Sequence, residues 1–123
     1  MSDSINSTTN SSLSILVVDD DELNQRMMRL LLKRDGHLVE CASNGAEAFN
    51  AVKSKDYDIV LMDLQMPIMD GYETTQNIRE LEKVSYNKAY IIALTAHNTE
   101  AFKLKCYDSG MDSFCNIFII NFI

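Results

Sequence analysis

Residues 15–20 carry the sequence ILVVDD, four aliphatic residues followed directly by two aspartates. An aliphatic run without polar alternation is typical of a strand that is buried on both faces. Residues 59–63, with the sequence IVLMD, repeat this character and again end in an acid. Because strands buried on both faces belong mainly to parallel sheets covered by crossover helices, the two stretches together predict an α/β fold.

Other strand patterns occur over residues 38–41 and 89–94 and from Ser113 onward, so that up to five strands are expected. Helical patterns separate them, over residues 23–31, 44–52, 70–81 and 99–108, and Gly36 and Gly110 supply two of the helix stops. The apolar spacing also predicts which residues turn inward: Leu23, Met27, Leu30 and Leu31 in the first helix, Tyr72, Thr75, Ile78 and Leu81 in the third, and Ala101 and Leu104 in the last.

Length and composition narrow the function classes. The chain has 123 residues and a formal net charge of -7, which suits one domain and disfavours nucleic acid or an anionic membrane as a direct partner. Residues 1–13 are polar and are expected to form a disordered tail before a domain over residues 14–123. No apolar run approaches the roughly 20 residues of a membrane span. The widely spaced Cys41, Cys106 and Cys115 are interpreted as reduced packing residues, which favours a cytoplasmic protein.

The acids that end the strands are the candidate functional residues. In a right-handed succession of βαβ units the carboxyl ends of all strands lie at one edge, so Asp19, Asp20, Asp63 and Thr95 should converge there. Carboxylates a few ångströms apart repel by roughly 4 kcal/mol per close pair at an effective dielectric constant near 20. A hard dication would offset this repulsion, and Mg²⁺, which prefers oxygen ligands and keeps several waters, suits such a site.

A metal at this edge suggests phosphate chemistry. With Mg²⁺ held by Asp20 and Asp63, one oxygen of Asp63 remains free to attack a phosphoryl donor, and the Thr95 hydroxyl could hydrogen-bond the transferred group. The alternative is that Asp19, Asp20 and Asp63 are solvated strand-end residues or helix caps. The residues alone leave both interpretations open.

Several motifs resemble the receiver domains of response regulators. Residues 15–21 resemble their acid-pair motif, with Asn24 a frequent companion of that pair, residues 62–71 (MDLQMPIMDG) their phosphoacceptor motif, and residues 91–96 (IIALTA) their switch strand. The resemblance covers residues 14 to about 114 and implies a flavodoxin-like, doubly wound sheet of five parallel strands in the order 2-1-3-4-5.

The resemblance also implies roles for individual residues. Asp63 would be the phosphoacceptor, and a histidine kinase or a histidine phosphotransfer protein the donor. Asp20, Asp63 and the main-chain carbonyl of Gln65 would bind Mg²⁺, with Asp19 helping through a water. Thr95 would sense the phosphate, and Phe114 stands where the family often places an aromatic switch residue, although a core phenylalanine is an equally good interpretation.

The chain departs from the family pattern from about residue 115. The family expects a lysine and a proline after the fifth strand, where Ile117 and Phe118 stand here. A charge-assisted hydrogen bond of this kind contributes about 1.5–3 kcal/mol, so its loss should slow phosphorylation or weaken the response. The last helix is also missing from the pattern. The apolar residues 117–123 could extend the fifth strand, cover the sheet or mediate self-association, and a truncated or altered reading frame is a further explanation.

Two functions of the receiver fold therefore compete. The first is a phosphoacceptor of a phosphorelay that promotes its own phosphorylation and dephosphorylation but is not an enzyme acting on other substrates. The second is a pseudo-receiver, a binding module that is not productively phosphorylated because Ile117 replaces the lysine. A phosphohydrolase or a flavin carrier shares the architecture and forms a weaker third class.

Overall fold

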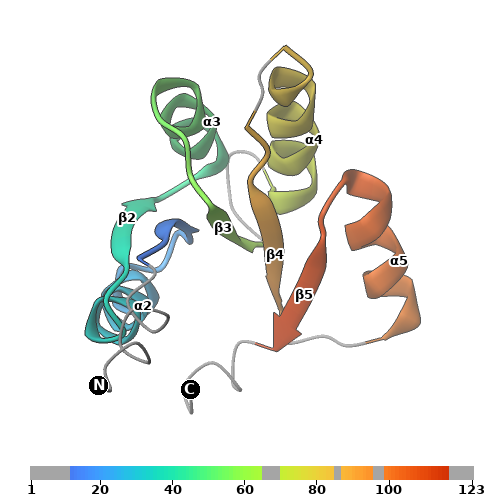
Figure 1. Cartoon of the computed structure of the whole chain (residues 1–123). Helices are drawn as coiled ribbons and strands as arrows, with labels where there is room; N and C mark the ends of the chain where they lie inside the picture. Colours follow the sequence, from blue (N-terminus) through green and yellow to red (C-terminus); the bar gives the residue numbers. More distant parts are fainter. Residues whose placement is uncertain (1–11, 65–69, 85–86, 96–98, 117–123) are drawn as a thin grey trace, which may run out of the picture.

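The computed structural model describes residues 12–64, 70–84, 87–95 and 99–116. The strands are β1 (Ser14–Val18), β2 (Leu38–Ala42), β3 (Ile59–Asp63), β4 (Tyr90–Thr95) and β5 (Ser113–Asn116). The helices that alternate with them are α2 (Glu22–Arg34), α3 (Gly45–Ser54), α4 (Gly71–Glu82) and α5 (Glu100–Ser109), labelled as in Figure 1. Each expected strand and helix is present within a few residues of its predicted bounds.

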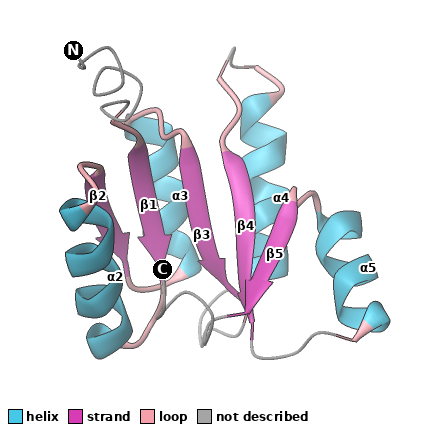
Figure 2. Ribbon diagram, turned by 60° about the horizontal axis from the view of Figure 1, so that its bottom comes forward, coloured by secondary structure: helices cyan, strands magenta, loops and turns pink. Residues whose placement is uncertain are grey.

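The strands form one parallel sheet in the order β2-β1-β3-β4-β5, which confirms the expected topology (Figure 2). Val18 at the end of β1 lies beside Ala42 of β2 and Met62 of β3. Asp63 in turn lies beside Leu94 of β4. The carboxyl ends of these strands therefore meet at one edge of the sheet, as the candidate site requires.

Alternate residues of the central strands supply two separate cores. Leu16, Val18, Val60 and Met62 face one side, where Ala48 of α3, Ile78 of α4 and Cys106 of α5 pack against them. Ile15, Val17, Leu61 and Leu94 face the other side, which Met28 of α2 covers. Figure 1 shows α2 on the opposite side of the sheet from α3 and α4. Burial on both faces accounts for the unbroken aliphatic runs of the strands.

Hydrogen bonds at the helix ends explain where the helices begin and stop. The side chains of Asn44 and Asp70 accept hydrogen bonds from the amides of the third residues after them, at 2.9 and 2.8 Å. Gly36 and Gly110 follow α2 and α5 with φ angles of 93° and 108°, a left-handed conformation in which glycine has no Cβ to clash. These local signals are therefore confirmed.

Part of the predicted inward face is wrong on two helices, although Met27 and Leu31 of α2 are half-buried as expected. Leu23 and Leu30 of α2 are 63% and 66% exposed, while Gln25 and Met28 are buried instead. On α5, Ala101 and Leu104 are exposed and Cys106 is buried. Both faces were assigned from apolar residues, but polar or small side chains occupy part of each buried face. On α4 the assignment is confirmed for Thr75 and Ile78, which are buried.

The two ends of the chain, residues 1–11 and 117–123, lie outside the described residues. The tail over residues 1–13 is described only from Ser12. There, the Leu13 carbonyl accepts a hydrogen bond of 2.9 Å from the Leu38 amide, and its side chain packs on the α2-covered core. Two expectations depend on residues 117–123: the absence of the last helix and the isoleucine at the position of the family's lysine. A helix long and apolar enough to cross a membrane is not found in the described part of the chain.

Candidate functional site

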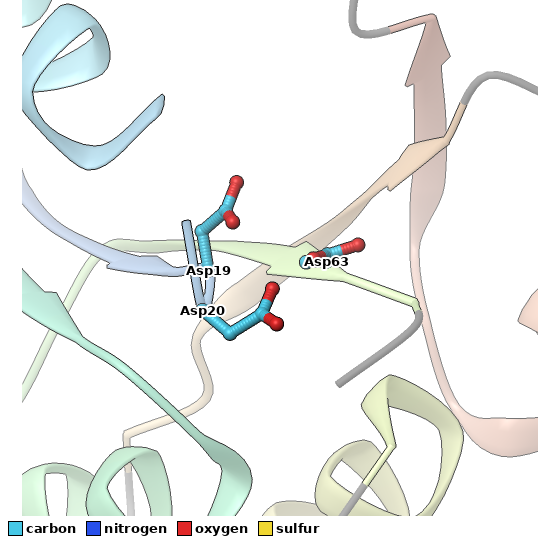
Figure 3. A group of neighbouring side chains, drawn as sticks. All are labelled: Asp19, Asp20 and Asp63. Atoms are coloured by element: carbon cyan, nitrogen blue, oxygen red, sulfur yellow. The ribbon is translucent and has the colours of Figure 1, made fainter. Parts of the chain in front are cut away.

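Three aspartates meet at the carboxyl edge of the sheet. Asp19 and Asp20 directly follow β1, and Asp63 is the last residue of β3, its hydrogen-bonded neighbour. One carboxylate oxygen from each lies within 4.8 Å of the others. Figure 3 shows the three side chains together at the strand ends. The convergence predicted from the sequence is therefore confirmed for all three acids.

Asp19 is the buried member of this cluster, with only 1% of its surface exposed. Burial raises the pKa of its carboxyl above the ordinary value of 3.8, and the neighbouring charges of Asp20 and Asp21 add to the rise. Hydrogen bonds from the Asp21 amide, at 2.8 Å, and from the Asn24 side chain lower the pKa in part. Keeping Asp19 ionised is therefore costly without a compensating positive charge.

Gln25, which sequence reasoning missed, fixes the backbone beneath this cluster. The buried Gln25 amide nitrogen donates to the Asp19 carbonyl at 2.5 Å and to the Ser43 hydroxyl at 3.1 Å. It thereby ties α2 to the ends of β1 and β2. A polar residue on a helix gives no local sign of facing inward, so only the tertiary contact identifies this role.

Gly71 is a second residue whose role the sequence did not reveal. A Cβ atom at this position would lie 2.3 Å from the Asp63 carbonyl oxygen and 2.9 Å from the Leu64 Cα. The Gly71 amide donates to the Leu64 carbonyl at 3.1 Å. The start of α4 therefore packs directly on the backbone that carries Asp63, at a distance that only glycine permits.

Thr95 lies at the same edge as the acids. Since Asp63 pairs with Leu94, Thr95 is the next residue along the neighbouring strand, and it is 7% exposed. Phe114 lies on β5 opposite Ala93 and packs against the core covered by α3, α4 and α5. The Lys103 ammonium lies 4.9 Å from the centre of the Phe114 ring. Gln65 and Ile117, the remaining residues implied by the resemblance, lie outside the described residues.

The chemistry of the cluster fits a hard divalent cation. All the donor atoms are carboxylate oxygens, the ligand type that Mg²⁺, Ca²⁺ and Mn²⁺ prefer over thiolate or imidazole. Asp20 is exposed and Asp63 is half-buried, which leaves the site open to water and to a ligand. Within the ranges that the structure describes, no other group of three such ligands was found.

Comparisons with known proteins identify the family of the chain. The sequence model of the response regulator receiver domain family matches residues 15–116. Hybrid signal transduction histidine kinase B of Dictyostelium discoideum is 42% identical over 109 residues, which cover 81% of this chain and 6% of that protein. The chain therefore spans only a small part of this curated relative.

Solved structures give the same result. The receiver domain of the Arabidopsis thaliana histidine kinase CKI1, complexed with Mg²⁺, has a TM-score of 0.79 and 33% identity, covering 87% of this chain and 84% of that one. The receiver domain of Saccharomyces cerevisiae Ssk1, solved with the histidine phosphotransfer protein Ypd1, also has a TM-score of 0.79, with 31% identity and coverage of 85% and 78%.

Proposed function

The chain belongs to the response regulator receiver domain family, and on this premise we propose that Asp63 accepts a phosphoryl group from a phosphohistidine of a partner protein. The observation that carries the proposal is the cluster of three carboxylates, with ligand atoms within 4.8 Å of one another, at the edge where parallel sheets bind ligands. Asp63 is half-buried, so its carboxylate is accessible to a donor.

The proposed reaction is a direct transfer between two side chains. An oxygen of the Asp63 carboxylate attacks the phosphorus while the phosphorus–nitrogen bond of the phosphohistidine breaks. The electron pair of that bond stays on the imidazole, which takes up a proton, and Asp63 becomes an acyl phosphate. In such transfers the protein mainly aligns the attacking and leaving groups and neutralises the charge on the phosphoryl oxygens.

Different residues are proposed to bind the metal ion and the phosphoryl group. Asp20, Asp63 and the main-chain carbonyl of Gln65 are the proposed Mg²⁺ ligands, with Asp19 acting through a water. Bound Mg²⁺ supplies the positive charge that offsets both the carboxylates and the phosphoryl oxygens. The Thr95 hydroxyl, at the adjacent strand end, is proposed to donate a hydrogen bond to the transferred phosphoryl group and so to sense it. The conformational switch that follows would include Phe114.

The proposed partners are a histidine kinase or a histidine phosphotransfer protein. The Ypd1 complex of the Ssk1 receiver and the hybrid kinase relatives support this choice. The chain itself would act as a phosphoacceptor that promotes its own phosphorylation and dephosphorylation, without turnover of another substrate. Its net charge of -7 disfavours direct binding of nucleic acid, and the reduced state of Cys41, Cys106 and Cys115 suits the reducing cytoplasm.

The pseudo-receiver alternative is based on Ile117. If no other cation replaces the family's lysine, the lost charge-assisted hydrogen bond of about 1.5–3 kcal/mol would slow the transfer by roughly 10- to 150-fold. The two lysines of α5 are engaged elsewhere: Lys103 lies over Phe114, and the Lys105 ammonium lies 4.3 Å from the centre of the Tyr72 ring. Slow but measurable phosphorylation is therefore the expected result.

The test is phosphorylation of the purified chain by phosphoramidate, a small donor with the same phosphorus–nitrogen bond. Intact mass spectrometry should detect one added phosphoryl group in the presence of Mg²⁺ and none with a chelator. Asp63→Asn should abolish the gain. Asp108→Asn, a matched change at an exposed acid of α5, should leave it intact.

Two results would contradict the proposal. Wild-type protein that gains thermal stability from Mg²⁺ but is not phosphorylated after long incubation would establish the pseudo-receiver alternative. Phosphorylation of the Asp63→Asn variant would place the acceptor elsewhere.

A further inference from the structure

One face of the sheet carries an open apolar groove beside α2. This groove has a volume of about 260 Å³. It extends from the amino end of β1 across the sheet to β5, and its apolar lining includes Leu13, Met28, Leu32, Leu61, Ile92 and Cys115. Among the described helices only α2 packs on this face, whereas α3, α4 and α5 share the other. Apolar surface of this kind is stabilised by being covered.

We propose that residues 117–123 of the same chain turn back from β5 and fill this groove. Their sequence, IFIINFI, contains six apolar residues and one asparagine and has no charged side chain. Its composition therefore matches the groove, in which Asp35 and His37 are the polar members of the lining. The inference does not depend on phosphorylation, because the groove lies on the face of the sheet and the acids at its edge.

The chain connection makes this occupant reachable. Cys115 of β5 already lines the groove, two residues before Ile117. Seven extended residues span up to about 23 Å, and a five-residue strand such as β1 is only about 17 Å long. The segment can therefore reverse direction after β5 and still run back along the length of a strand on this face.

The size of the groove suits an aromatic ring. A cavity of about 150 Å³ is large enough to bind a benzene molecule, and this groove has a volume of about 260 Å³. Phe118 and Phe122 are the two rings that the segment offers. The residues that form the core on this face, among those described, include no aromatic side chain, so a ring placed there has a distinct signature.

The tethered segment should outcompete a second copy of the chain. A short tether gives an effective concentration on the order of millimolar, well above usual protein concentrations. Two copies would also bring together two net charges of -7, whereas residues 117–123 contain no charged side chain. Intramolecular docking is therefore favoured over self-association through this face.

The methyl group of Met28 reports on the groove in the full chain. With ¹³C-methyl methionine labelling, the Met28 methyl should show a nuclear Overhauser effect to a phenylalanine ring and an upfield ring-current shift. Phe118→Leu and Phe122→Leu keep an apolar side chain but remove one ring each, and at least one of them should abolish both signals. Met62 and Met111, in the core on the opposite face, serve as internal controls and should not shift.

The outcomes separate the possible occupants. An aromatic contact that stays intramolecular in a mixture of labelled and unlabelled protein, and that survives dilution, supports the proposal. A contact between different copies, lost on dilution, would assign the groove to a second copy and overturn it. A Met28 methyl without any aromatic contact in the wild-type chain would also overturn it, and this measurement needs no variant to fold.

Discussion

Close packing around Gly71 connects the start of α4 to the backbone that carries Asp63. The missing side chain of Gly71 lets the start of α4 approach the Asp63 carbonyl, where a Cβ would lie at 2.3 Å. Backbone atoms cannot rotate away as a side chain can. A larger residue must therefore move either α4 or the end of β3, and the second movement displaces Asp63.

Gly71→Ala should consequently impair both stability and the site. We expect a loss of about 1–3 kcal/mol in the free energy of unfolding, measured by urea denaturation, and weaker Mg²⁺ binding measured by calorimetry. Gly36→Ala is the matched control. Its expected loss of about 1 kcal/mol in stability comes from the backbone alone, because φ is 93° and an added Cβ would meet open space. It should lower stability while leaving Mg²⁺ affinity unchanged. Equal Mg²⁺ affinity in the two variants would refute the packing role of Gly71.

At the scale of elements, Arg79 connects α4 to β4 and to the loop between α5 and β5. Its guanidinium donates to the Gly110 carbonyl at 2.8 Å and forms ion pairs with Glu82 at 2.7 Å and Asp112 at 2.6 Å. Both acids accept a second hydrogen bond from the backbone around β4, Glu82 from Ala89 and Asp112 from Ile91. The network lies at the amino ends of β4 and β5, away from the aspartates.

Arg79→Met should therefore destabilise the fold without affecting metal binding. We expect a loss of roughly 2–4 kcal/mol, because Glu82 is only 5% exposed and would keep an uncompensated charge. Lys83→Met removes an ion pair of similar length, 2.6 Å, but with both partners largely exposed, and should cost less than about 0.5 kcal/mol. Urea midpoints compare the two variants. A similar loss in both would mean that burial of the Arg79 network contributes little.

At the scale of the whole molecule, the buried Asp19 couples stability to pH and to metal. Because its pKa is raised above 3.8 in the folded state, the folded chain binds this proton more tightly than the unfolded chain does. The stability contributed by protonated Asp19 is complete below the unfolded pKa and is lost as the pH rises through the folded pKa. The ionised form of the buried Asp19 therefore destabilises the metal-free protein at pH values above the folded pKa.

Asp19→Asn should raise the melting temperature of the metal-free protein at neutral pH and flatten its dependence on pH. The amide oxygen can still accept the hydrogen bond from the Asp21 amide, so the change mainly removes the charge. Thermal melts in chelator from pH 4 to 8, compared with the wild-type protein, isolate this effect because the two proteins differ only at position 19. Mg²⁺ should stabilise the wild type more than the variant. A lower melting temperature of the variant throughout this range would contradict the assigned cause of the pKa shift.

The sequence by itself determined the fold class, the order of the elements and the acids of the candidate site. The aliphatic runs at residues 15–18 and 59–62 specify strands buried on both faces, and parallel pairing then brings Asp19, Asp20 and Asp63 to one edge. Helix ends at Asn44, Asp70 and Gly110 were equally readable. These features depend on neighbouring residues and on the handedness of chain connections, both of which are local.

Only the tertiary structure decided which helix faces are buried and which residues support the site. Leu23 and Leu104 match an apolar pattern yet lie exposed, while the polar Gln25 is buried because carbonyl and hydroxyl groups from β1 and the end of β2 surround its amide. Gly71 and Arg79 gain their roles from atoms of other elements, at the end of β3 and around β5. Burial and close approach depend on distances across the folded chain, which the spacing of residues along one helix does not determine by itself.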